Sequence, residues 1–494
     1  MNTENKDEPT RPHSLFRNWM SLIGTVMGIG ALFSFFLLFM LDAVANFSSP
    51  YIGILTYCVV PVFLISGIAL TFLGAWLERR KRKRGNQAVP RMQIDFSNPG
   101  DRRKFIIFVI GSGIFIMLSA VGSYNAFEVT ESVAFCGETC HTVMKPELTT
   151  HDHGPHARVA CVACHVGPGA SWFVRSKISG SYQLYAVAFH KYPTPIPTPI
   201  KNLRPARETC EQCHWPKSFV GNLDRTFNYF QDDVSNTPYS IRLLLKVGAG
   251  DDPGDSSTAP PGGIHWHILS GNTVEYIATD AARQNIPWVR LTDAQGVVTV
   301  FRAPRFTNDI SQYEIRKMDC MDCHNRPAHR YVAPEFAVNQ ALAQRQIDPG
   351  IPWIKTNAVY VLTRKYATDE EARDGIATLL TQLYPNDARI RPAIPVVQQI
   401  YADNFFPEMK ADWSKYPDNI GHMIWPGCFR CHDGLHKTAD NLRTIKADDC
   451  NSCHTILAQG SGPDLLKMTP GGQQFIHVGG DYDLTCAECH TGGP

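Results

Sequence analysis

The sequence predicts a membrane-anchored protein with three transmembrane helices and an outer domain that is mostly helical and irregular, with a small β insertion. Two observations support this prediction. Three apolar runs occupy residues 19–41, 51–77 and 105–127, and each is long enough to cross a bilayer. The rest of the chain holds repeated pairs of cysteines, each pair followed directly by histidine.

The first apolar run has no charged side chain and lacks the small-residue cleavage site of a signal peptide, so we interpret it as a retained anchor. Between the second and third runs lies a basic loop, in which residues 79–84 are all Arg or Lys. The positive-inside rule places this loop in the cytoplasm and the chain after the third span on the outer side. Nucleic acid is not an expected partner, because the loop is short and lies between two spans. Residues 1–128 are therefore the predicted membrane anchor.

Fourteen of the fifteen cysteines form seven motifs in which the second cysteine is followed by histidine. The first motif has three residues between its cysteines and the others have two: Cys136/Cys140/His141, Cys161/Cys164/His165, Cys210/Cys213/His214, Cys320/Cys323/His324, Cys428/Cys431/His432, Cys450/Cys453/His454 and Cys486/Cys489/His490. In such a motif the thiols add to the vinyl groups of haem and the imidazole binds its iron. Zinc-binding cysteine pairs do not require that histidine. The sequence therefore predicts a multihaem cytochrome c with seven covalently bound haems.

The motifs divide the outer domain. Residues 129–224 hold the first three motifs, residues 317–332 the fourth and residues 406–494 the last three, where little secondary structure is expected. Residues 225–316 lack cysteine and have strand-like runs between Gly and Pro turns, which predicts a β-rich insertion with strands at 239–247, 263–269, 273–278, 288–291 and 297–302. Residues 333–405 change to helical spacing, with helices expected at 333–346, 354–366, 369–382 and 394–403, the third preceded by a capping box at Thr368.

Each haem iron has a second axial position to fill. Ten histidines of the outer domain lie outside the motifs, and this surplus favours bis-histidine ligation, which suits electron transfer better than a terminal reductase. The distal ligands predicted from the residues are His156, His267, His329, His422, His436 and His477. His267 shares the face of a predicted strand with His265, which is left open together with His151, His153 and His190.

From the third span through His329 the chain resembles the NapC/NirT/NrfH family of membrane-anchored, quinol-oxidising multihaem cytochromes. The resemblance rests on residues 136–144, on His156 and His329, and on Lys177, twelve residues after His165. It implies that Met144 binds the first iron while the motif histidine is displaced, and that His156 and His329 are distal ligands. It also implies that Lys177 lines a quinol pocket, although an interfacial lysine that snorkels to water is an open alternative.

The acidic residue of the family's quinol pocket has no counterpart at the matching position, where this chain has Leu184 with Gln183 beside it. We include Gln183 in the predicted pocket for that reason. Glu147 and Asp152 are the predicted proton acceptors, because they lie close in sequence to the first haem motif.

Within this family, a chain with three spans and seven haem motifs most resembles the heptahaem inner-membrane cytochromes. These imply menaquinol as substrate, a multi-pass location in the bacterial inner membrane with the haem domain in the periplasm, and transfer of electrons to periplasmic c-type cytochromes in anaerobic or extracellular respiration. Residues 129–494 hold 34 basic and 38 acidic residues, which favours a basic soluble partner besides membrane lipid and the menaquinone pool. The alternative is a non-catalytic electron-transfer subunit or docking scaffold, and the oligomeric state is left open.

Overall fold

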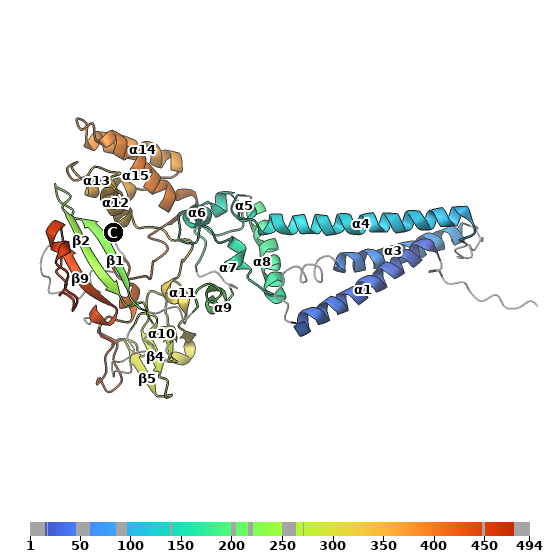
Figure 1. Ribbon diagram of the computed structural model, residues 1–494, viewed down its shortest axis with the longest axis horizontal. Helices are drawn as coiled ribbons and strands as arrows, with labels where there is room; N and C mark the ends of the chain where they lie inside the picture. The colour runs from blue at the N-terminus through green and yellow to red at the C-terminus, as the bar shows by residue number, and fades with distance from the viewer. Residues whose placement is uncertain are drawn as a thin grey trace, which may run out of the picture. The chain divides into compact units, whose positions relative to one another are not determined.

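The computed structural model describes residues 15–16, 18–45, 60–84, 96–138, 141–198, 204–215, 221–248, 263–269, 271–446 and 450–478 (Figure 1). Four of the predicted haem-binding residues, Cys140, Cys486, Cys489 and His490, lie outside these ranges. The chain divides into two compact units. One comprises Met1–Phe135 and Cys161–Leu184, and the other comprises Cys136–Ala160 and Tyr185–Pro494.

The first unit contains three long helices, α1 (Trp19–Ala45), α3 (Val60–Lys83) and α4 (Pro99–Glu131), followed by α7 (Cys161–His165) and most of α8 (Ala170–Ala188). Helices α1 and α3 pack closely through small residues. A Cβ atom at Gly67 would lie 2.6 Å from the backbone nitrogen of Gly28, and the Ser21 hydroxyl donates to the Thr71 carbonyl oxygen at 2.8 Å. Such close approach of small residues is how helices associate in lipid.

Among the described residues, two helices are long and apolar enough to cross a membrane, over Trp19–Phe36 and Val60–Lys81. The second predicted span was expected to begin at residue 51, and its residues before Val60 lie outside the described ranges. The third predicted span, residues 105–127, lies inside the single helix α4, which Asn98 caps by accepting from the Gly100 N–H at 2.9 Å. Helix formation here agrees with the sequence, whereas membrane crossing by α4 stays a prediction.

Two main sheets form in the second unit. The first has strand order β1 (Leu223–Phe230), β2 (Pro238–Leu245), β9 (His454–Gly460), all antiparallel, and these strands lie side by side in Figure 1. The second has the order β5 (Val298–Arg302), β4 (Trp288–Thr292), β3 (Thr273–Ile277), β6 (Arg316–Lys317). A short pair, β7 (Phe405–Phe406) and β8 (Ala411–Asp412), completes the strands among the described residues.

The strands depart from the sequence-based expectation in three places. The strand predicted at 263–269 is instead a turn that leads into the helical turn α10 (Trp266–Leu269). The last part of the chain, where little secondary structure was expected, contributes β9 to the first sheet, with Ile456, Leu457 and Ala458 buried. Strand β1, which was not predicted, has its first six residues exposed, so its pairing with β2 and not an apolar pattern defines it.

Four helices follow one another between residues 334 and 404: α12 (Pro334–Ala343), α13 (Ile354–Leu362), α14 (Asp369–Leu383) and α15 (Ile390–Asn404). Their inward faces share one apolar core, in which Leu342, Ile354 and Ile376 are fully buried. The Thr368 hydroxyl accepts from the Glu371 N–H at 3.1 Å, as the predicted cap requires, while the Glu371 carboxylate accepts from Ala367 N–H at 2.6 Å. The helices confirm the change to helical spacing read from the sequence.

Candidate haem-binding sites

Short helical turns carry the cysteine and histidine motifs. The first begins in α5 (Val133–Gly137), and its histidine begins α6 (His141–Asp152). The second is α7, the third begins at the last residue of α9 (Ala206–Cys210), and the fourth begins with α11 (Cys320–Cys323). The fifth and sixth lie at the 3-10 turns η5 (Gly427–Arg430) and η6 (Cys450–Ser452). Residues three apart lie on the same face of a helical turn, so this backbone lets both sulfurs of a motif face one cofactor. Each site is named below by the order of its motif.

Three of the predicted haem-binding cysteines in the described part of the chain lie at the surface. Cys164 in the second motif, Cys213 in the third and Cys428 in the fifth are exposed, whereas Cys161 and Cys210, the first cysteines of the second and third motifs, are half-buried. Haem attachment at these cysteines stays a prediction.

Four motif histidines each face a second histidine from a separate segment of the chain. The distances between ring centroids are 6.1 Å for His214 with His156, 6.3 Å for His324 with His265, 5.9 Å for His432 with His267 and 6.2 Å for His454 with His422. The third, fourth, fifth and sixth sites therefore share one arrangement, in which the centres of two imidazole rings stand about 6 Å apart.

This spacing fits two imidazoles that bind the same iron from opposite sides. A metal–nitrogen bond is about 2 Å long and the ring centre lies about 1 Å beyond the nitrogen, so two such centroids stand about 6 Å apart. Among the described residues, no three His, Cys, Asp or Glu side chains gather into a group that could hold a metal ion alone. Two imidazoles that can bind iron, with a cysteine pair beside one of them to attach the haem, are the residues that a c-type haem requires.

The protonation of these imidazoles also suits ligation. Burial lowers the pKa of His267, His324, His432 and His454, which favours the neutral ring that binds metals. In three of the paired histidines outside the motifs, Nδ1 faces a backbone carbonyl: that of Pro327 at 3.0 Å for His156, that of Val247 at 2.5 Å for His265 and that of Ile264 at 2.9 Å for His267. A carbonyl only accepts, so Nδ1 carries the proton and Nε2 keeps its lone pair.

Cysteines of successive sites lie near one another, which gives the order of four sites in space. The Cys320 thiol hydrogen-bonds with Cys210, which lowers the pKa of Cys320 to about 7. Part of Cys428 reaches the surface, but the chain packed around its thiol excludes water and raises its pKa to about 12, and the nearby thiols of Cys323 and Cys453 raise it further. Neighbouring thiols thus link the third site to the fourth, the fourth to the fifth and the fifth to the sixth.

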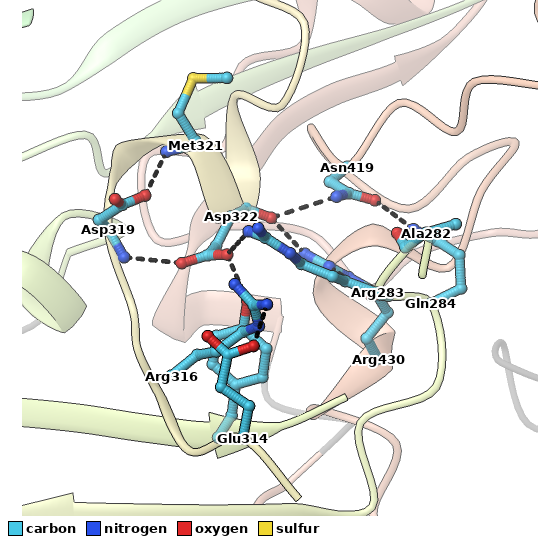
Figure 2. Close-up of polar contacts among 11 residues, drawn as sticks. Ala282, Arg283, Gln284, Glu314, Arg316, Asp319, Met321, Asp322, Asn419 and Arg430 are labelled. Atoms are coloured by element: carbon cyan, nitrogen blue, oxygen red, sulfur yellow. Dashed lines mark hydrogen bonds and ion pairs between the residues drawn. The ribbon is translucent and has the colours of Figure 1, made fainter. Parts of the chain in front are cut away.

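A polar network joins the fourth and fifth sites (Figure 2). The carboxylate of Asp322, which lies inside the fourth motif, accepts from Arg283 at 2.8 Å and from the Asp319 N–H at 2.8 Å, and it also contacts the Tyr276 hydroxyl. Arg430, which lies inside the fifth motif, donates to the Asp322 carbonyl oxygen at 2.7 Å. Two haem motifs that lie far apart in sequence are therefore connected by direct hydrogen bonds.

The other predicted axial ligands have different surroundings. His329 Nδ1 faces the Glu147 carbonyl at 2.9 Å, the same second-sphere pattern as His156. His477 is exposed, and its Nδ1 faces the Val478 carbonyl at 2.8 Å. His436 is buried with both ring nitrogens hydrogen-bonded, Nδ1 to Asp433 at 2.8 Å and Nε2 to the Ile286 carbonyl at 2.7 Å, which leaves neither for iron. Met144 lies half-buried on α6, and His165 ends α7.

Lys177 lies on α8 within a small polar cluster in the first unit. Its ammonium group forms an ion pair with Glu131, donates to the Thr130 hydroxyl at 3.3 Å, and lies 5.1 Å from the centre of the Phe173 ring. Ser176, one residue earlier on α8, is 3.3 Å from the carbonyl oxygen of His165. The cluster therefore connects the end of α4 with the motif of the second site. Sequence analysis missed Glu131, although its position at the end of an apolar helix could have indicated it.

The predicted proton acceptors lie in the second unit. The Glu147 carboxylate accepts from Arg326 at 2.8 Å and lies 3.5 Å from His329 Nδ1. Asp152 is exposed and lies 3.2 Å from His151 Nδ1. Gln183 is exposed on α8. The structure thus gives Glu147 an ion-pair partner of its own, and gives Lys177 a different acidic partner.

Comparisons with known proteins show a cytochrome c family for this chain. The model of the NapC/NirT cytochrome c family, N-terminal region, matches residues 100–197. The cytochrome c-type protein ImcH of Geobacter sulfurreducens is 42% identical over 492 residues, which cover 96% of this chain and 95% of that protein. No solved structure matches the chain.

Proposed function

Because the chain belongs to the NapC/NirT family of c-type cytochromes and is similar to ImcH over nearly its whole length, we propose that it oxidises menaquinol and passes the electrons to periplasmic cytochromes. Electron transfer by a membrane cytochrome c is what the family establishes. We further propose that menaquinol is the substrate, that the chain binds seven haems, that it crosses the membrane several times, and that its partners are periplasmic. One observation supports the quinol above all: Lys177 and Glu131 meet at the end of an apolar helix.

The Lys177 cluster combines the features that a quinol site needs. Its polar groups, Lys177, Glu131 and Thr130, can hydrogen-bond a quinol oxygen, and Phe173 supplies an apolar wall. The Lys177 side chain is 36% exposed and that of Glu131 is 15% exposed, so the pair is reachable but largely removed from water. On the same helix, the apolar side chain of Ile178 is 68% exposed, which fits contact with lipid.

Each residue has a chemical role in this proposal. Lys177 donates a hydrogen bond to a quinol oxygen and orients the ring. The quinol loses two electrons and two protons, and Glu131 accepts each proton in turn and releases it to water, because it is the carboxylate already in contact with Lys177. Haem, when bound, supplies one-electron redox chemistry. The hydrogen bond between Cys210 and Cys320, and the closeness of Cys428 to Cys323 and Cys453, support onward transfer through neighbouring sites.

Reduction of the purified full-length protein by a menaquinol analogue, followed by haem absorbance, tests this function. We expect the wild type to be reduced without a partner and Lys177→Met to react about 10- to 100-fold more slowly, because a charged hydrogen bond contributes about 1.5–3 kcal/mol. Arg175→Met is the matched control, since Arg175 lies on the same helix and contacts Trp172 instead. A wild-type protein that dithionite reduces but the quinol does not would favour the non-catalytic electron-transfer subunit.

A further inference from the structure

The turn at residues 263–269 presents two histidines to two different haem sites. His265 faces His324 with the rings nearly parallel, at 13°, whereas His267 faces His432 with the rings nearly perpendicular, at 84°. The two imidazoles are therefore directed to separate sites and not to the same one.

Backbone contacts fix the position of this turn. The Ile264 N–H donates to the Lys246 carbonyl at 2.7 Å, directly after β2, and the Trp266 N–H donates to the Gly263 carbonyl at 3.0 Å. A Cβ atom at Gly263 would lie 1.9 Å from the carbonyl oxygen of Gly248, so only glycine permits this approach. The turn is thus anchored to the first sheet, independently of the motifs that its histidines face.

Hydrogen bonds orient both rings in the same sense. His265 Nδ1 lies 2.5 Å from the Val247 carbonyl oxygen, and His267 Nδ1 lies 2.9 Å from the Ile264 carbonyl oxygen. Because a carbonyl only accepts, the proton is on Nδ1 in both rings, and Nε2 is left as the donor atom for a metal. Histidines that bind metals usually have their second ring nitrogen held in this way.

We propose that His265 is the distal iron ligand of the fourth site and that His267 is the distal iron ligand of the fifth site. One short turn then supplies a ligand to each of two successive haems and holds them as neighbours. The hydrogen bond from Arg430 to the Asp322 carbonyl oxygen joins the same two sites from the side of their motifs. The assignment depends on haem attachment and not on which molecule supplies the electrons, so it stands apart from the quinol chemistry.

The test uses the full-length protein and the variants His265→Ala, His267→Ala and the double variant. Low-temperature electron paramagnetic resonance and near-infrared magnetic circular dichroism of the oxidised proteins count low-spin, bis-histidine haems. We expect each single variant to lose one such haem and the double variant to lose two. The haem that loses its ligand should become high-spin and return to low-spin when imidazole is added. Total haem, measured as the pyridine haemochrome, should stay unchanged.

His153→Ala is the matched control, because His153 directly follows α6, is exposed, and has its Nδ1 2.9 Å from the Thr149 carbonyl oxygen. It should keep the full number of low-spin haems. The proposal fails if His265→Ala also keeps that number, or if the double variant loses only one. Should the alanine variants not mature, His265→Met and His267→Met retain a ligating side chain. Each should raise the midpoint potential of one haem and give the absorption band of methionine-bound iron, and unchanged potentials would overturn the proposal.

Discussion

The guanidinium group of Arg430 donates to the backbone carbonyl oxygen of Asp322 at 2.7 Å, and this bond connects the interior of one haem motif to the interior of another. Arg430 is only 9% exposed and also donates to the carbonyls of Gly427 and Arg283, each at 2.8 Å. Asn419 donates to the same Asp322 carbonyl at 3.2 Å (Figure 2). The spacing of the fourth and fifth sites is therefore held by protein contacts in addition to the cofactors.

Arg430→Met should destabilise the protein by about 3 kcal/mol, because it removes one donor from each of three carbonyl groups, although that of Asp322 keeps Asn419. The loss of such a bond costs about 1–3 kcal/mol before relaxation. The measurement is denaturant unfolding of the purified protein, followed by circular dichroism. Arg443→Met is the control, since exposed Arg443 donates to the Thr299 hydroxyl at 2.9 Å, and its effect should stay within about 0.5 kcal/mol. Equal effects of the two substitutions would show that the Arg430 bonds do not stabilise the fold.

Such links between sites could not be read from the sequence. The motifs themselves were readable, because a cysteine pair followed by histidine is a local pattern. The partners of their histidines were not, since His156 and His214, or His265 and His324, come from distant segments that only the folded chain brings together. Local spacing alone predicted a strand at residues 263–269, where contacts with Lys246 and Gly248 impose a turn. The helices from α12 to α15 were predictable because their apolar faces share one core.

Glu131→Gln should slow reduction by a menaquinol analogue about 10- to 100-fold, because it removes the carboxylate that contacts Lys177 and takes up the proton. The rate should fall without a change in the haem absorption spectrum. A stopped-flow measurement at several quinol concentrations separates slower chemistry from weaker binding. An unchanged maximal rate would remove Glu131 from proton transfer.

Glu147→Gln provides the contrast, since Glu147 was a predicted proton acceptor. Its carboxylate accepts from Arg326 at 2.8 Å, and Arg326 lies over the rings of Tyr331 and Tyr416, 4.7 and 4.3 Å from their centres. Both partners are largely buried, so we expect a loss of about 2 kcal/mol in the free energy of unfolding with little change in the quinol rate. A slow quinol reaction with unchanged stability would instead restore Glu147 as the proton acceptor.

Gly67→Ala should weaken the packing of α1 against α3 by about 1–3 kcal/mol, because the new methyl group would lie 2.6 Å from the backbone nitrogen of Gly28 in α1. Backbone can relieve such a clash only if the whole helix shifts. Titration with sodium dodecyl sulfate, followed by far-ultraviolet circular dichroism, measures the loss of helix association. Gly111→Ala in α4 is the control, since no atom lies within 4 Å of its Cβ position. The control should be neutral or slightly stabilising, as alanine favours a helix. A destabilised control would mean that any added methyl group disturbs the anchor.

His436→Ala distinguishes a structural histidine from an iron ligand. The sequence predicts His436 as a distal ligand from its position near the fifth motif, but its Nδ1 faces the Asp433 carboxylate and its Nε2 faces the Ile286 carbonyl. Burial of an imidazole with both nitrogens bonded makes its removal costly, so we expect a loss of about 1–3 kcal/mol in unfolding free energy. The number of low-spin haems should stay at the wild-type value, whereas His267→Ala should reduce it by one. A new high-spin haem in His436→Ala, with stability unchanged, would show that the ring turns to iron once haem is attached and that the two hydrogen bonds give way.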